Sequence, residues 1–118
     1  MKNFFVRFLQ LPDLSSLEYS KLAVRVWRMI VVKHSAGEEW VVTVQGTVMT
    51  HHCVRVTKAD LDRFSEGRSP EKLLEESFRF LLERESNTSI LGSFDLPVIG
   101  RYFPEYEREI RTLLRRST

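Results

Sequence analysis

The hydrophobic pattern of the chain changes its period at Thr57, and this change constrains the fold more than any other feature. From Leu22 to Val56, β-branched and aromatic residues alternate with polar ones between turn signals, which is typical of strands. After Thr57, apolar residues recur at intervals of three and four, which indicates amphipathic helices. Strands followed by helices predict an α+β domain rather than alternating βαβ units.

The strand-rich part divides into three segments separated by turns. The expected strands are 22–33, 39–44 and 48–56, with a polar loop at 34–38 and a turn at 45–47. Trp40, Val42 and Val44 share one face of the second strand, and we expect that face to lie on the core. The short turns predict a three-stranded antiparallel β-meander.

Two helices are expected directly after the meander. Thr57 and Asp60 have the spacing of a capping box, so a short helix should follow and end at the left-handed cap offered by Gly67. Ser69 as N-cap and Pro70 at the first helical position open the strongest helix. Its expected core residues are Leu73, Leu74, Phe78, Leu81 and Leu82.

Two shorter helices complete the expected fold. Asp95 is expected to cap one through Val98 and Ile99, and Pro104 to open the last one. The sequence therefore predicts three to four helices packed on one sheet face. Residues 22–118 form the expected single domain, and residues 1–21 an N-terminal extension.

The charged residues of the strongest helix have a simple interpretation. Glu75, Glu76, Glu83 and Glu85 are expected on a solvated face, where Arg79 and Arg84 pair with them at three or four residues. Phe80 falls outside the densest apolar stripe, so we expect it to touch the sheet or a partner.

Composition excludes several classes of protein. The chain has 118 residues, which suits one domain, and its net charge of +2 is too small to indicate a polybasic nucleic-acid or membrane binder. One cysteine excludes an internal disulfide framework and a Cys-pair zinc ribbon. Arg7 interrupts the only apolar run near the N-terminus, so we expect a cytoplasmic protein without a membrane span.

The helical part also carries a set of short motifs. They are SFRFLLERE (77–85), SIL (89–91), FDL (94–96), Ile99, YFPEY (102–106) and Ile110. The set resembles a group of small uncharacterised bacterial proteins for which no activity is known. The resemblance covers roughly Met29 to Ile110 and implies a bacterial setting. Members often begin near the first strand, which makes Met29 a hypothetical native start.

Chemistry-bearing residues are few, and no cofactor site is expected. His51 and Cys53 lie on one strand face while His52 points to the other, and His34 would have to approach across strands. Two ligands fall short of the three or four that zinc requires, so ordinary sheet histidines are the favoured interpretation over a metal site. An enzyme that uses the Cys53–His51 pair ranks third among the functions.

The favoured function is a non-catalytic interaction or accessory module. Tyr102, Phe103 and Tyr106 either anchor the last helix in the core or form an interaction surface together with the basic Arg25 and Arg55. Self-association through a sheet edge, giving a homodimer, is one partner hypothesis. The alternative function is nucleic-acid-linked regulation, because the segment before Thr57 has a small positive excess and arginines cluster at the C-terminal end. Its antitoxin-like form is suggested by the small size and the α+β layout.

Overall fold

The computed structural model describes residues 29–116, and the expected strand residues before Met29 lie outside that range. The domain is α+β, with a four-stranded mixed sheet in the order β1-β2-β3-β4. The strands are β1 (Ile30–Ala36), β2 (Glu39–Gln45), β3 (Met49–Arg55) and β4 (Ser93–Asp95). The helices are α3 (Lys58–Phe64), α4 (Pro70–Leu82), the 3₁₀-helix η1 (Asn87–Ser89), α5 (Val98–Tyr102) and α6 (Tyr106–Arg116).

The antiparallel β1–β2–β3 meander is confirmed, and the largest change of boundary is at the end of β1. β1 continues to Ala36, although a loop was expected from His34, and it turns tightly at Gly37 with φ +56°. His34 extends the pairing because its ring packs on Trp40 with centroids 4.7 Å apart and its Nε2 meets the Gly37 carbonyl at 2.8 Å. Only a glycine adopts this backbone conformation readily, so the hairpin needs two turn residues rather than five.

β4 was not expected, and the sheet is therefore not purely antiparallel. This strand pairs parallel with β3, with Phe94 beside Val54. The helices between β3 and β4 supply the long crossover that a parallel pair requires. Asp95 consequently ends a strand and does not cap α5, which begins after Pro97.

The N-cap predictions for the two helices after the meander are confirmed, whereas α3 has Ser65 as its C-cap and the first left-handed residue after it is Glu66, with φ +52°. Thr57 and Asp60 form the reciprocal capping box of α3, and the Ser69 side chain accepts a hydrogen bond from the backbone of Lys72 at the start of α4. Gly67 adopts φ +77° between the two helices. Local hydrogen bonding thus sets where these helices begin.

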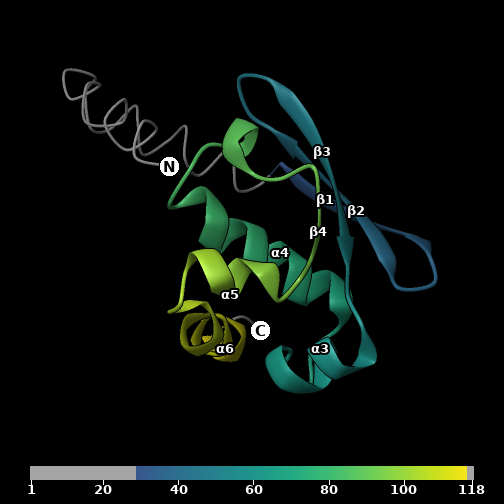
Figure 1. Ribbon diagram of the computed structural model, residues 1–118, viewed down its shortest axis with the longest axis vertical. Coiled ribbons are helices and arrows are strands. Elements are labelled where there is room, and N and C mark those ends of the chain that lie inside the picture. Colours follow the sequence, from purple (N-terminus) through teal and green to yellow (C-terminus); the bar gives the residue numbers. More distant parts are fainter. Residues whose placement is uncertain (1–28, 117–118) are drawn as a thin grey trace.

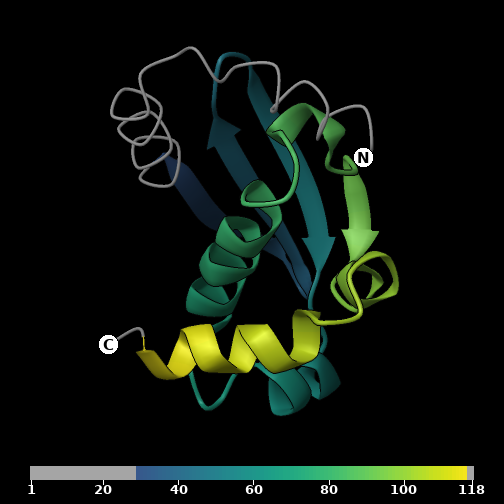
Figure 2. The same cartoon turned by 90° about the vertical axis from the view of Figure 1, so that its left-hand side faces the viewer.

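The helices cover one face of the sheet, as Figures 1 and 2 show from two sides. α4 crosses that face, and α6 packs across α4 on the side away from the sheet. The core lies between these layers. Its fully buried members include Val42, Val44, Val54, Leu73, Leu74, Phe78, Phe80, Leu96, Tyr106, Ile110 and Leu114.

Phe80 lies wholly inside this core rather than at its margin. Its ring meets Tyr106 and Phe103 edge-on, with centroids 5.3 and 5.9 Å away. α4 is buried on the side that faces the sheet and also on the side that faces α6. Its apolar surface is therefore wider than one stripe. A helix sandwiched between a sheet and another helix buries residues on both sides.

Candidate binding site

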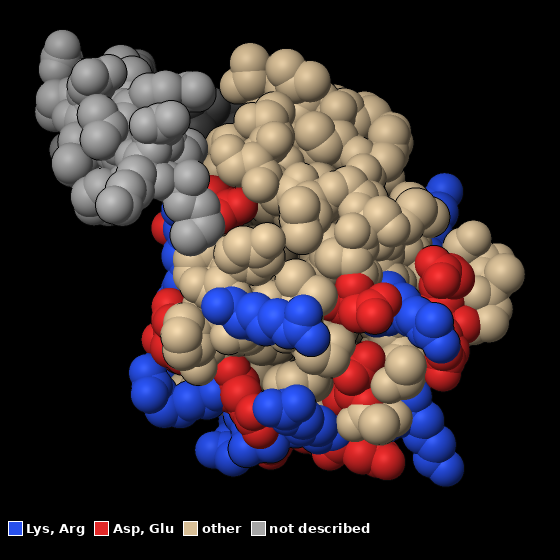
Figure 3. All heavy atoms as spheres, viewed as in Figure 1, with Lys and Arg blue, Asp and Glu red and all other residues tan. Residues whose placement is uncertain are grey.

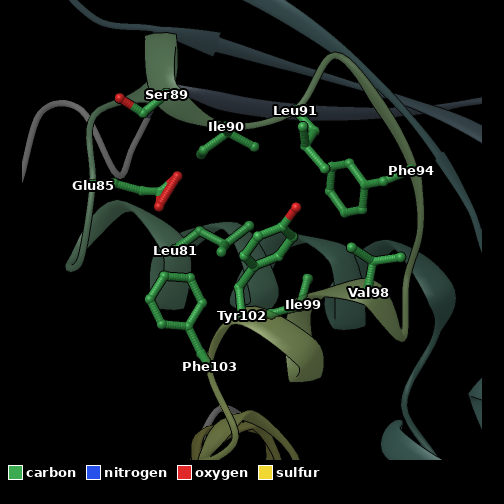
Figure 4. Close-up of a pocket in the computed structure, with 10 residues that line it drawn as sticks. All are labelled: Leu81, Glu85, Ser89, Ile90, Leu91, Phe94, Val98, Ile99, Tyr102 and Phe103. Carbon is green, nitrogen blue, oxygen red and sulfur yellow. The ribbon is translucent and has the colours of Figure 1, made fainter. Parts of the chain in front are cut away.

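A pocket opens where the C-terminal end of α4, the segment from η1 to β4, and α5 meet. Its cavity volume is about 200 Å³, and Figure 4 shows its lining. We call it the Glu85 pocket; it is lined by Leu81, Glu85, Ser89, Ile90, Leu91, Phe94, Val98, Ile99, Tyr102 and Phe103. Most of these side chains are apolar, which is typical of ligand-binding sites.

Glu85 is the only ionisable carboxyl group in this lining. The residue is 5% exposed, and its carboxylate points into the pocket (Figure 4). It makes no side-chain hydrogen bond or ion pair with any residue between 29 and 116. Burial raises the pKa of Glu85, because an apolar surrounding disfavours the charged form.

Arg84, although adjacent to Glu85 in the chain, is turned to a different side of α4. Its guanidinium donates to Glu105 at 3.1 Å and to Glu109 at 3.0 Å, and it lies 3.6 Å from the ring centre of Phe80. These contacts tie α4 to α6 behind the pocket. The nearest arginine in sequence therefore does not neutralise the Glu85 carboxylate.

Of the aromatic residues expected to form an interaction surface, Tyr102 is the exposed one. Its side chain stands in the pocket opening and is 57% exposed (Figure 4). Phe103 is half-buried beside it, and Tyr106 is fully buried with its hydroxyl 2.7 Å from Ser77 Oγ. Burial also raises the pKa of Tyr106, so its hydroxyl is a core hydrogen-bonding group.

The two arginines assigned to the same surface do not join these aromatics. Arg55 lies at the end of β3 and forms an exposed ion pair with Glu38 at 3.1 Å. Arg25 lies outside the described residues.

The histidine and cysteine residues are separated by the sheet. His51 and Cys53 are exposed on the face away from the helices, where His51 Nδ1 meets Thr43 Oγ1 at 3.0 Å, whereas His52 points into the core. Within residues 29–116, no three His, Cys, Asp or Glu side chains lie close enough together to hold a metal ion. The structure thus gives the Cys53–His51 pair no enclosed site.

His52 connects β3 to the wall of the Glu85 pocket. Its Nδ1 lies 2.7 Å from the Leu91 carbonyl, which only accepts, so Nδ1 carries the proton. Its Nε2 accepts from the Thr50 hydroxyl at 2.8 Å, and Thr50 in turn accepts from the Asn87 amide at 2.8 Å. With Nε2 as an acceptor the imidazole is neutral, and burial lowers the pKa of His52, which favours this neutral form.

The stability of the protein should consequently fall in mild acid. Because the pKa of His52 is lower in the folded state than in the unfolded one, the unfolded state binds more protons. We expect the free energy of unfolding to decrease as the pH falls below about 6.5, by up to roughly 1.4 kcal/mol per pH unit from this residue. Urea titrations between pH 7 and pH 5 measure this slope.

Two variants test whether His52 causes this dependence of the unfolding free energy on pH. His52→Gln should lose most of it, whereas His51→Gln, which changes the exposed neighbour, should retain most of it. An unchanged slope in His52→Gln would contradict the assignment.

Three residues of this region were misassigned or overlooked from the sequence. Glu85 was expected on a solvated face, and Glu76, also expected there, is 4% exposed with Arg79 at 2.8 Å. Glu85 follows Leu81 by four residues and so continues the buried side of α4. The helical period of the sequence could therefore have predicted that Glu85 is buried. Asn87 carried no comparable signal, because its partners lie on another segment.

Within residues 29–116, no helix has the length and apolar character needed to cross a membrane. The resemblance to small bacterial proteins stays a prediction, and so does the start at Met29. Comparisons of this chain with protein-family models, with curated proteins and with solved structures found no match.

Proposed function

We propose that the protein is a non-catalytic interaction module that binds a partner at the Glu85 pocket. The observation that carries this proposal is a buried carboxylate without a partner among residues 29–116, set in an open apolar cavity. A folded domain gains nothing from such a group by itself, because a buried charge is costly unless it is paired. A bound partner supplies the missing compensation.

The surface next to the pocket also supports binding. No Lys, Arg, Asp or Glu occurs from residue 40 to 54 or from 86 to 94, and the charges in Figure 3 gather away from the upper part of the view. Val48 and Leu91 are exposed in these two segments. Asn87 donates to the Val48 carbonyl and His52 Nδ1 meets the Leu91 carbonyl, so the two segments adjoin and form an uncharged surface beside the pocket.

A test uses a neutral pentapeptide, acetyl-Ser-Leu-norleucine-Leu-Ser-amide, titrated against ¹⁵N-labelled protein. We expect its addition to shift amide signals of the pocket lining. Leu91→Ser should weaken binding roughly threefold to tenfold, because part of an apolar side chain is removed from the contact. Val31→Ser is the control, since Val31 is similarly exposed (47%) but lies on β1, away from the pocket. Equal loss in both variants, or no shift at the pocket with either this peptide or its lysine counterpart, would count against the proposal.

The alternative, nucleic-acid-linked regulation, has less support. The arginines near the C-terminus are engaged with carboxylates: Arg111 lies 2.7 Å from Glu107, and Arg115 lies 3.2 Å from Glu66. Each such pair reduces the positive charge that phosphates would meet. Self-association rests on β1, which lies at the edge of the sheet in this part of the chain.

A further inference from the structure

No lysine or arginine among residues 29–116 lines the Glu85 pocket, and its walls indicate how a cation would have to be presented. The carboxylate lies at one side of the cavity, while Leu81, Phe94 and Ile99 contribute apolar surface around it (Figure 4). An occupant that fits must therefore combine a positive end with an apolar body. Lysine and arginine have this construction, because an aliphatic stem carries the charged head.

Aromatic rings complete the match to a basic side chain. The Tyr102 ring stands between Glu85 and Phe94, and Phe103 lies below the carboxylate (Figure 4). The faces of such rings attract cations, and this attraction strengthens when water is excluded. A cation at Glu85 would meet both a carboxylate and aromatic surface.

No described arginine or lysine of the chain fills this role. Arg84 is bound to Glu105 and Glu109, and Lys72 and Arg79 pair with Glu75 and Glu76 further back on α4. None of the described residues that line the pocket is basic. No positively charged side chain of the described lining therefore faces Glu85.

We propose that the Glu85 pocket binds a lysine or arginine side chain, flanked by apolar residues, from a peptide segment of a partner protein. This inference rests on the proposed function. A peptide is favoured over a small free amine because exposed Leu91 belongs both to the pocket lining and to the uncharged surface, so the contact continues beyond the cavity. The basic residue enters the cavity, and its apolar neighbours lie on Leu91 and Val48.

The test compares three peptides, acetyl-Ser-Leu-Xaa-Leu-Ser-amide, with lysine, norleucine or glutamate as Xaa, titrated at pH 7.5 and followed by amide shifts. The lysine peptide should bind about tenfold more tightly than the norleucine peptide, as expected for one charge-assisted contact in a sheltered site. The glutamate peptide should bind most weakly. n-Pentylamine, which carries the ammonium without the peptide, should bind at least tenfold more weakly than the lysine peptide.

Two matched variants test whether Glu85 causes the preference for the lysine peptide over the norleucine peptide. Glu85→Gln should remove the advantage of lysine over norleucine, and Glu83→Gln should keep it, because Glu83 undergoes the same change on an exposed side chain two residues away. A ¹⁵N correlation spectrum confirms that each variant is folded.

The outcomes separate this inference from the proposed function. If lysine and norleucine peptides bind equally in the native protein, the preference for a cation is wrong while binding at the pocket stands. If the amine alone binds as tightly as the lysine peptide, the peptide source is wrong. If no peptide shifts the pocket signals, both proposals fail.

Discussion

Replacing Phe80 by alanine is expected to lower the free energy of unfolding by about 3–5 kcal/mol, the range for removing a buried aromatic ring from a packed core. The side chain is 0% exposed. It contacts α6 through Tyr106, the segment before α6 through Phe103, and the guanidinium of Arg84. The deletion would remove apolar contacts and also the surface over which Arg84 is held.

Urea denaturation at pH 7 measures this loss, with Phe80→Leu as the comparison. Leucine keeps much of the apolar volume, so its cost should be about 1–2 kcal/mol. Because Phe103 also lines the Glu85 pocket, the alanine variant should in addition shift the amide signals of α5. A loss under about 1 kcal/mol for alanine would show that this ring is not packed as described.

Asn87→Ala is expected to cost about 2–3 kcal/mol, because it removes two good hydrogen bonds from a buried amide. The amide nitrogen donates to the Val48 carbonyl and to Thr50 Oγ1, each at 2.8 Å. Its oxygen lies against Gly46, where an added Cβ would come within 3.0 Å. One side chain therefore fastens the β2–β3 turn to η1.

The measurement combines urea denaturation with amide hydrogen exchange at the turn. Thr88→Ala is the control, because Thr88 is exposed and bonds only to the Ser86 hydroxyl among its described contacts. We expect Thr88→Ala to stay within about 0.5 kcal/mol of the native protein. Equal stabilities for the two variants would contradict the role of Asn87.

The features that the sequence predicted well are those set by neighbouring residues. The capping box of Thr57 and Asp60 spans only four residues of chain, and the period-two pattern through Trp40 assigns the buried face of β2. Gly67 likewise takes its left-handed conformation between two helices, as expected. Local hydrogen bonds and side-chain direction decide each of these outcomes.

The features that were missed depend on partners far away in the chain. β4 has three residues and is a strand only because Phe94 pairs with Val54. Phe80 is buried only because α6 covers its side of α4. The pocket was not foreseen for the same reason: Glu85, Leu91 and Tyr102 come from three segments that meet only in the folded domain.

The shortness of β4 has a consequence for motion. Backbone bonds from Cys53 to Gly92 and from Leu96 to Arg55 hold this strand to β3 at the edge of the sheet. Elements held by few bonds at an edge open at a lower free energy than the core does. The wall that carries Leu91 and Phe94 can thus detach as a local unit while the meander and α4 stay folded. Such a local opening would widen the Glu85 pocket without global unfolding.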